Sequence, residues 1–549
     1  MSFFFLVIVS FVLVAFGEPA WFPLLAPIAA TVGYALFWKA MLQKPSRAYR
    51  FSLATFWFAS IFAVHLSWMT TTAFVGASIL ILYFILIFAI GVQFGLLSLL
   101  IPFNKQLSLS RILFISGVWV FMEYSRLFVL SGFSWNPVGL SLTAFNLSLQ
   151  LVSVVGIYGL SFLVICANLL ALKVIINRGT LKTKIAWIAS AIFPYIFGFF
   201  TLAYHEKESM QNKEGFLSAL LVQTAVLPNQ KASFDDGEKQ LTPLEQWEKI
   251  LYLLSEHRGR DIDLIVFPEG TVSYPSDLLL YSYDSLFYHF DHYFGGKSVA
   301  HLPPLIEPLA VWQEDRRFWA VSNRYWAWAI SNVFSADVVV GLEAIEKRGE
   351  QFLGFQSAFY VKPGTHIHDH YDKQILVPIG EYIPFSWCKK LASRFGIYDS
   401  FTPGNCMQVF DGKVVTSLSI CYEETYGHLM REGKLQGSKC FVNITNDGWY
   451  PGSKLPEQHF YHSRLRSVEN GVPLIRACNT GVTAVVDSVG RVICQIPLEH
   501  ELSAGGILAK VPLYSYNTLY TYWGDYCILT ISLVCVLSFL LKIKTKDML

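Results

Sequence analysis

Residues 51–104 read FSLATFWFASIFAVHLSWMTTTAFVGASILILYFILIFAIGVQFGLLSLLIPFN and contain no Asp, Glu, Lys or Arg. A helix that spans a bilayer needs about 20 mainly apolar residues, so this stretch is long enough for two such helices. Residues 127–172 and 185–204 are also free of charged side chains. Together these stretches predict a polytopic α-helical membrane bundle, with helices near residues 2–17, 20–42, 51–70, 74–101, 112–131, 150–172, 185–204 and 519–541.

The composition of the whole chain excludes an ordinary soluble protein. Hydrophobic residues make up 53% of the 549 residues and charged residues only 15%, whereas soluble proteins carry about 25% charged residues. Aromatic residues alone reach 16%, which excludes intrinsic disorder. The net charge of +2 hides an uneven distribution, because residues 1–200 hold 11 Lys and Arg but 2 Asp and Glu, and the remaining residues hold 31 and 38. The chain therefore joins a membrane part to a water-facing part.

Basic residues in the short loops predict the orientation, because cytoplasmic loops carry an excess of Lys and Arg. Apart from Arg126, the basic residues before residue 205 and in the tail occur only in or next to the second, fourth and sixth loops and after the last helix. They are Lys39, Lys44, Arg47, Arg50, Lys105, Arg111, Lys173, Arg178, Lys182, Lys184, Lys542, Lys544 and Lys546. Both chain ends are thus predicted to be cytoplasmic, and the segment between the seventh and eighth helices to lie outside. An alternative interpretation of residues 2–17 is a cleaved signal peptide, which would not move that segment.

We expect three regions: a transmembrane bundle of about seven helices (1–205), an external domain (206–518), and a C-terminal helix with a basic tail (519–549). The external domain alternates between strands and helices, which is typical of an α/β fold. Thr242-Pro243-Leu244-Glu245 forms a capping box that begins a helix. The predicted strands are residues 217–226, 263–268, 337–342, 355–362, 414–422, 440–444 and 482–494.

Two charged residues fall inside the fifth predicted helix. Glu123 and Arg126 are three positions apart, so they share a helix face and can pair. Charged side chains within the hydrocarbon layer are costly and often functional, which makes both of them candidate site residues of the membrane part. The alternative is a structural pair that ties helices together. His65 in the third helix is interpreted as a hydrogen-bonded core residue.

Three motifs at strand ends carry side chains suited to acyl chemistry. They are Phe267-Pro268-Glu269-Gly270, the segment from Tyr371-Asp372-Lys373 to Gly380-Glu381, and Ile420-Cys421-Tyr422-Glu423-Glu424. A thiol needs a neighbouring base or cation to act as a nucleophile, and a tetrahedral intermediate needs a donor for its oxyanion. Each motif alone is a weak signal. Together, Cys could supply the nucleophile, Glu the base and Lys the oxyanion donor, without a metal or cofactor.

The order and context of these motifs resemble the nitrilase superfamily, and the surrounding membrane helices resemble its membrane-bound branch, the apolipoprotein N-acyltransferase family. The resemblance covers nearly the whole chain and is most specific in Pro268-Glu269, residues 373–384, Cys421-Tyr422-Glu423, residues 446–449, residues 464–469 and residues 476–481. Gly132-Phe133-Ser134-Trp135, which follows Glu123 and Arg126, resembles the family's membrane-part motif. The resemblance implies a nitrilase-like αββα sandwich for the external domain.

The resemblance also implies roles for individual residues. Glu269 would be the general base that activates Cys421, and Lys373 would stabilise the oxyanion together with the backbone N–H of Tyr422. Glu381 would orient Lys373, and Glu423 would support the pocket or the incoming amine.

Substrates and location follow from the same resemblance. The acyl donor would be a phospholipid and the acceptor the α-amino group of an N-terminal diacylglyceryl-cysteine on an apolipoprotein, in a ping-pong reaction without cofactor or metal. The protein would be a multi-pass protein of the bacterial inner membrane, with its catalytic domain on the periplasmic side.

Some residues depart from the family pattern. Ala225 and Phe234 stand where the family usually has Asn and Trp. An insertion near residues 271–334 is rich in aromatic side chains, and these favour the membrane interface. It is interpreted either as a lid that enters the lipid or as an ordinarily packed insertion.

Alternative functions remain open at this stage. A membrane-anchored nitrilase-type amidase would use the same residues with water as acceptor, and a transporter or assembly factor would not use them. His366, His368 and His370 would share one face of a strand and could bind a metal, although the proposed chemistry needs none. Cys388 and Cys406 could form a disulfide. Neither a nucleotide-binding glycine motif nor a basic nucleic-acid-binding cluster is present in the sequence.

Overall fold

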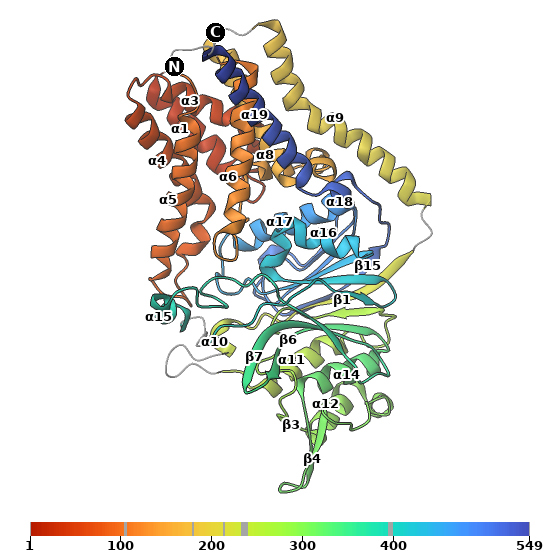
Figure 1. Ribbon diagram of the computed structural model, residues 1–549. Helices are drawn as coiled ribbons and strands as arrows, with labels where there is room; N and C mark the ends of the chain where they lie inside the picture. The colour runs from red at the N-terminus through yellow and green to blue at the C-terminus, as the bar shows by residue number, and fades with distance from the viewer. Residues whose placement is uncertain are drawn as a thin grey trace.

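The computed structural model describes residues 2–103, 107–177, 180–211, 215–231, 240–393 and 399–547. A helical bundle occupies one end and a domain of packed β-sheets the other, and both chain ends lie at the far end of the bundle (Figure 1). Three residues used in the sequence interpretation, Lys105, Arg178 and Phe234, lie outside the described residues, as does the side chain of Lys546.

Each of the eight predicted membrane segments overlaps helical structure. The principal helices are α1 (Phe3–Phe16), α3 (Tyr34–Met41), α4 (Arg47–His65), α5 (Ile79–Ser98), α6 (Leu109–Ser125), α8 (Val152–Asn177), α9 (Leu181–Gln211) and α19 (Tyr526–Asp547). By length and composition, five of the described helical segments are able to cross a membrane: Pro23–Met41, Ile79–Ser98, Val152–Ile176, Leu181–Gln211 and Tyr526–Lys544. The number that do cross remains a prediction.

The second segment is not one regular helix. It consists of a 3₁₀ turn, a short α-helical turn, a π-helical turn at Ala29–Gly33, and then α3. The π-turn displaces backbone groups from the α-helical hydrogen-bond ladder, and the Asn168 side chain of α8 binds them. Its Oδ1 accepts the N–H groups of Tyr34 (2.9 Å) and Ala35 (3.2 Å), and its Nδ2 donates to the Ala30 carbonyl (2.8 Å). In an apolar environment, backbone N–H and C=O groups need hydrogen-bond partners within the protein, and Asn168 supplies them here.

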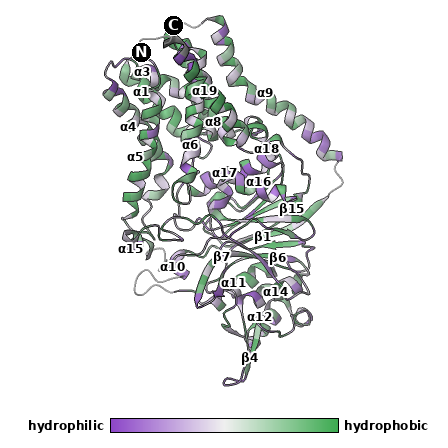
Figure 2. Ribbon diagram, viewed as in Figure 1, coloured by the Kyte–Doolittle hydropathy of each residue, from purple (hydrophilic) through white to green (hydrophobic). Residues whose placement is uncertain are grey.

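The bundle exposes a large apolar surface. Figure 2 shows hydrophobic residues along most of its helices, and only 11% of the most apolar window of α9 is buried. Side chains such as Phe199 and Phe200 are 61% and 67% exposed. Soluble proteins rarely expose contiguous apolar patches of this extent, so this surface is suited to contact with lipid.

The second part of the chain is an αββα sandwich, as the sequence predicted. One six-stranded sheet has the order β15-β1-β2-β6-β7-β8, and the other has the order β14-β13-β12-β11-β10-β9. The strands are β1 (Phe216–Gln223), β2 (Leu264–Val266), β6 (Asp337–Arg348), β7 (Gln351–Val361), β8 (Asp369–Asp372), β9 (Val409–Asp411), β10 (Val415–Ile420), β11 (Cys440–Thr445), β12 (Leu474–Cys478), β13 (Ala484–Val486), β14 (Val492–Gln495) and β15 (Gly505–Pro512).

Helices cover both outer faces of the sandwich. Buried side chains of both sheets, such as Val339 and Val442, form the core between them. Helices α11 (Pro243–Ser255) and α14 (Asn323–Phe334) pack on the first sheet, and α11 begins with the predicted capping box. Helices α16 (Gly427–Leu435) and α17 (Leu455–Asn470) lie on the second sheet.

One strand differs from the sequence prediction, and the structure describes the insertion that the sequence left open. Residues 482–494 form a hairpin of β13 and β14 instead of one strand, because the chain reverses at Gly490, where φ is +81°. The insertion near residues 271–334 contains a small sheet, with β3 (Tyr281–Ser282), β4 (Ala310–Gln313) and β5 (Phe318–Val321), and helix α12 (Tyr283–Phe294). It lies at the end of the sandwich farthest from the bundle (Figure 1), a position that favours ordinary packing over a lid in the lipid.

The bundle rests directly on the second sheet's helix layer. Leu455, Leu465 and Val468 of α17 belong to the same buried apolar cluster as the bundle helices. This joint brings the ends of β10 and β11 close to the membrane part.

Candidate active site

Cys421 stands at the sharp turn that follows β10. Its φ is +53°, a left-handed conformation that is costly for a residue other than glycine and that persists where the surroundings impose it. The side chain of Asn443 on β11 donates to the Cys421 carbonyl (3.3 Å) and to Ser419 Oγ (3.0 Å). The half-buried thiol is thus held at a defined position at the edge of the sheet.

Lys373 is the buried centre of a charged cluster. It follows β8 directly, and its side chain is fully buried. Its Nζ lies 3.0 Å from Glu269 Oε1 and 2.5 Å from Glu381 Oε1. Glu381 is fixed in turn by the Val377 N–H, which donates to its Oε2 (2.8 Å). The structure therefore brings together residues from two of the predicted motifs, Glu269 from the first and Lys373 and Glu381 from the second.

The charges of this cluster act on the thiol. Burial lowers the pKa of Lys373, but Glu269, Glu381 and Cys421 outweigh it and raise that pKa well above 10.5, so Lys373 stays an ammonium ion. Burial and the Glu269 carboxylate raise the pKa of the Cys421 thiol well above its usual value, against the effect of Lys373. The resting cysteine is consequently a thiol that needs a base, and Glu269, whose charge acts on it, is the candidate that the sequence proposed.

The Glu423 carboxylate accepts hydrogen bonds from two separate segments of the chain. Its Oε1 accepts from Tyr371 OH (2.8 Å) and from the N–H groups of Gln374 (2.6 Å) and Ile375 (3.1 Å), and its Oε2 accepts from the Ile420 N–H (2.8 Å). Burial raises the pKa of Glu423 to about 7, although these hydrogen bonds oppose the rise. Glu423 thus ties the loop after Lys373 to the turn that carries the thiol.

Tyr422 points to the bundle. Its OH accepts from the Ser134 N–H (3.3 Å) and donates to the Gly132 carbonyl (3.4 Å), and its ring stacks on Trp135 at 6.2 Å. The segment Gly132–Trp135 singled out in the sequence therefore packs directly against the residue that follows Cys421.

Glu123 and Arg126 are buried near this joint but do not form an ion pair with each other in the described structure. Glu123 Oε1 accepts the Val138 N–H (2.8 Å), and Arg126 Nε donates to Gln93 Oε1 (2.8 Å). The Arg126 guanidinium also lies 5.5 Å from the Trp119 ring. Glu123 thus holds the segment that follows Gly132–Trp135, whereas the Arg126 side chain contacts α5 and α6.

The sequence interpretation missed a second lysine beside the candidate base. Lys231, at the end of α10 (Pro228–Lys231), donates to the Gly270 carbonyl. Burial lowers the pKa of Lys231 to about 8, although the carboxylates of Glu269 and Glu343 act against this. No sequence signal marks it, because it follows β1 in a short polar segment far from Glu269 in the chain.

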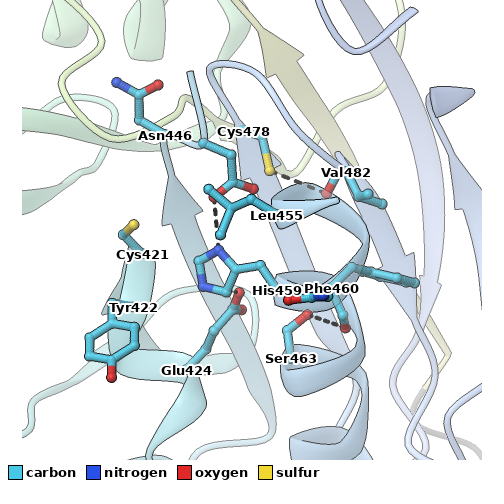
Figure 3. A network of polar contacts seen from close by, with 12 residues as sticks. Cys421, Tyr422, Glu424, Asn446, Leu455, His459, Phe460, Ser463, Cys478 and Val482 are labelled. Carbon is cyan, nitrogen blue, oxygen red and sulfur yellow. Dashed lines mark hydrogen bonds and ion pairs between the residues drawn. The ribbon is translucent and has the colours of Figure 1, made fainter. Parts of the chain in front are cut away.

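A buried cluster of two carboxylates, one arginine and one histidine lies beside Cys421, and Figure 3 labels two of its members, Glu424 and His459. His459 Nδ1 is 2.8 Å from Asp447 Oδ1, and its Nε2 is 3.2 Å from Glu424 Oε1. Arg476 Nε donates to the same Glu424 oxygen (2.9 Å), and its Nη2 lies 3.4 Å from Asp447 Oδ2. Asp447 and Arg476 fall in segments that carried the family resemblance, whereas His459 did not attract attention in the sequence.

The alternating histidines do not share a strand face. Among them only His370 lies in a strand, and His368 is buried with its Nε2 3.2 Å from the Thr365 carbonyl. In the described residues, two groups of side chains bring possible metal ligands within 4.8 Å of one another. One is Cys421, Asp447 and His459, and the other is Glu346, His370 and Asp372. His370 Nε2 already faces Asp372 Oδ1 at 3.5 Å.

The described cysteines form no disulfide. Cys388 is buried and Cys406 is exposed, and both are free thiols. The possible bridge between them is therefore absent from the structure.

Comparison with known proteins identifies the family. Residues 3–170 match the family model described as apolipoprotein N-acyltransferase N-terminal domain, and residues 224–509 match the carbon-nitrogen hydrolase model. An apolipoprotein N-acyltransferase from Chlamydia pneumoniae is 33% identical over 97% of this chain and 96% of its own length. Those from Chlamydia trachomatis serovar D and Geobacter metallireducens are 33% and 25% identical, over 97% of this chain and 95% and 94% of their lengths.

Similarity to solved structures is more distant. A nitrilase-superfamily amidase from Nesterenkonia aligns over 55% of this chain and 92% of its own, with 16% identity and a TM-score of 0.33. The two family models match the helical bundle first and the αββα sandwich after it, and the relatives match both parts together. This chain therefore belongs to the apolipoprotein N-acyltransferase family, the membrane-bound branch of the carbon-nitrogen hydrolase superfamily.

Proposed function

We propose that this protein transfers an acyl chain from a membrane phospholipid, through a thioester on Cys421, to the α-amino group of the N-terminal diacylglyceryl-cysteine of an apolipoprotein. The observation that carries the mechanism is the contact of the buried Lys373 ammonium with Glu269 and Glu381, beside the strained turn that presents Cys421. Membership of the acyltransferase family supports the substrates.

In the first half-reaction Glu269 takes the proton of the Cys421 thiol. The thiolate attacks the carbonyl carbon of the phospholipid ester, and the negative charge that develops on the carbonyl oxygen is stabilised by Lys373 and by the backbone N–H of Tyr422. When the tetrahedral intermediate collapses, the C–O bond breaks and the lysophospholipid oxygen takes the proton back from Glu269. The product is an acyl-thioester on Cys421.

In the second half-reaction the amine of the apolipoprotein attacks the thioester. Glu269 removes a proton from the attacking nitrogen, and the same donors stabilise the second oxyanion. The C–S bond breaks, the thiolate regains the proton from Glu269, and the acylated apolipoprotein leaves. The two substrates use one site in turn, so the kinetics are ping-pong.

The position of Cys421 suits substrates that come from the bilayer. Tyr422 contacts Gly132–Trp135 of the bundle, so the thiol lies at the joint between the sandwich and the membrane part. The chain ends lie together at the opposite end of the bundle (Figure 1). With the basic loops, this arrangement supports a location in the bacterial inner membrane, with the sandwich on the periplasmic side.

The direct test is to incubate the purified full-length protein with phospholipid labelled in its acyl chains. We expect a labelled adduct on Cys421 that hydroxylamine releases, no adduct with Cys421→Ala, and little adduct with Glu269→Gln. Labelling of Cys421→Ala at the wild-type level would refute the mechanism. Hydrolysis of small amides without any acyl transfer to an apolipoprotein peptide would instead favour the amidase alternative.

A further inference from the structure

A groove lies between helix α9 and the rest of the protein. One wall is a face of α9 within residues 193–205, and the other consists of the start of α8 and residues 516–519, which lead into α18 (Leu519–Trp523). The groove has a volume of about 610 Å³, within the range of about 300–1,000 Å³ that is usual for small-molecule sites. Its described lining residues do not include those of the site at Cys421.

The groove runs beside the line along which α9 contacts the bundle. Gly198 lies against the backbone of Leu147 in α7 (Asn146–Leu149), with no room for a Cβ atom at that position. Pro194, one turn earlier, is also buried. In contrast, Phe200 lines the groove and is still 67% exposed. The described chain therefore holds α9 in place but leaves the groove unfilled.

The two ends of the groove differ in polarity. Towards the start of α9 the lining is apolar, with side chains such as Phe193 and Phe197. Towards its end lie Tyr204 and His205, and the His205 ring stacks on Tyr516 at 3.7 Å. Tyrosine rings of this kind are enriched at the boundary between membrane and water. The groove thus has an apolar end and an interfacial end, as a phospholipid has.

The length of the groove matches one leaflet of a bilayer. Residues 193–205 of α9 cover about 18 Å at a rise of 1.5 Å per residue. The hydrocarbon layer is about 30 Å thick, which gives about 15 Å for each leaflet. The interfacial end is the end of α9 that leads into the sandwich. The groove therefore has the depth of one acyl chain in the leaflet next to the sandwich.

A cation stands at the interfacial end. Arg491 Nη2 lies 3.7 Å from Glu206 Oε2, and both side chains are about half exposed. Glu206 follows His205 directly in the chain. A guanidinium has five N–H donors, so its contact with Glu206 leaves donors for a second anion. Arginine binds phosphate groups particularly well, which suits the headgroup region of a phospholipid.

We propose that this groove is a phospholipid-binding site separate from Cys421. One acyl chain lies along residues 193–205 of α9, and the phosphate group lies near His205 and Arg491. The groove is continuous with the exposed apolar surface of α9, on which Phe199 is 61% exposed. The inference goes beyond the proposed function, because this lipid joins α9 to residues 516–519 and is not consumed.

The test uses a lipid that cannot donate an acyl chain. The full-length protein in detergent is mixed with a little ether-linked phosphatidylethanolamine that carries a diazirine in one chain, and labelled peptides are mapped by mass after irradiation. We expect label on both walls, at residues 193–205 and 516–519. Because the lipid has no ester, the result is independent of thioester formation on Cys421. A dialkylglycerol without phosphate should compete about tenfold more weakly than unlabelled ether phospholipid.

Thr201→Trp places a large side chain in the groove, since Thr201 lines it. We expect labelling of residues 516–519 to fall at least about fivefold, because the indole occupies the space of the chain. Phe199→Trp is the matched control, since Phe199 does not line the groove, and its labelling should stay within about twofold of wild type. Added ether phospholipid should also raise the Tm of wild type and of this control more than that of Thr201→Trp.

The proposal is overturned if Thr201→Trp labels residues 516–519 as wild type does. It is also overturned if label is spread evenly over the exposed apolar surface, since this would indicate freely exchanging membrane lipid only. Equal competition by the dialkylglycerol would contradict the phosphate contact. If Thr201→Trp does not fold, Val154→Trp on the opposite wall takes its place with the same expected loss.

Discussion

At the scale of single residues, the site depends on one cation shared by two carboxylates. Lys373 is fully buried between Glu269 and Glu381. Removing a buried partner leaves like charges close together without compensation. The site is therefore more sensitive to the loss of Lys373 than the number of its hydrogen bonds suggests.

Lys373→Met is expected to lower the rate of thioester formation by about 10²- to 10³-fold, the usual effect of losing an oxyanion donor. Lys373→Arg should not restore the rate, because the planar guanidinium does not replace a compact ammonium in a closed site. The labelled-phospholipid assay measures both variants. Lys413→Met, which breaks an exposed pair with Asp263, is the control, and comparable activity of Lys373→Met and this control would contradict the assigned role.

Glu423 makes stability depend on pH. Its pKa is raised by burial from 4.5 to about 7 in the folded protein, so the folded state binds the proton more tightly than the unfolded state. The stabilisation is complete below about pH 4.5 and is lost as the pH rises through about 7. Thermal unfolding in detergent should therefore show a Tm that falls over this window, and Glu423→Gln should flatten the fall.

The flattening should be partial, because burial also raises the pKa of Glu469 to about 7. A Tm of Glu423→Gln that falls as steeply as that of wild type would show that Glu423 does not contribute.

The candidate residues of the site could be named from the sequence for a local reason. Lys373 and Cys421 directly follow β8 and β10, and Glu269 comes three residues after β2, so the pattern of apolar runs places all three near strand ends. Lys231 and His459 were not predictable in this way. They reach the site by packing of a short helix and of α17, and nothing in their own sequence neighbourhood marks them.

At the scale of elements, irregular segments place the functional groups. The π-turn at Ala29–Gly33 interrupts the predicted helix 20–42, and the predicted helix 112–131 ends its α-helical part early, at Ser125, before the loop with Gly132–Trp135. Periodicity could not reveal the π-turn, because its backbone groups are satisfied by Asn168 on another helix. The hairpin of β13 and β14 was predicted as one strand, although the polar segment Asp487–Arg491 separates its two apolar runs and Gly490 has the positive φ that the reversal needs.

Asn168→Ala should destabilise the bundle by about 2–4 kcal/mol, because it leaves several buried backbone groups without a partner, each at a cost of about 1–3 kcal/mol. Thermal unfolding of the detergent-solubilised protein would measure the loss. Thr31→Val, which removes a local hydrogen bond to the Pro27 carbonyl on the same segment, is the control with a smaller effect. A change below about 0.5 kcal/mol for Asn168→Ala would contradict the role assigned to its side chain.

At the scale of the whole molecule, the joint between bundle and sandwich explains why the two parts occur in one chain. Tyr422 and α17 connect the turn that carries Cys421 to the bundle, while the aromatic insertion lies at the far end (Figure 1). The sequence predicted the two parts from charge and hydropathy. It could not predict which face of the sandwich meets the bundle, because that depends on packing between distant segments.

The predicted topology can be tested with cysteines and a membrane-impermeant maleimide. In cells with a permeabilised outer membrane, the exposed Cys406 should react, whereas a cysteine at the exposed loop position of Ser46→Cys should react only after the inner membrane is disrupted. If Ser46→Cys is labelled while the inner membrane is intact and Cys406 is protected, the predicted orientation is wrong.

The central claim is that Cys421 carries the acyl chain between two substrates, and a chase experiment tests it most directly. The acyl-enzyme is formed with labelled phospholipid, separated from all lipid donor, and then mixed with a diacylglyceryl-cysteine peptide. We predict that the label leaves Cys421 and appears on the peptide amine in equal amount, without added phospholipid. Label that stays on the enzyme, or peptide acylation that requires fresh phospholipid, would contradict the account.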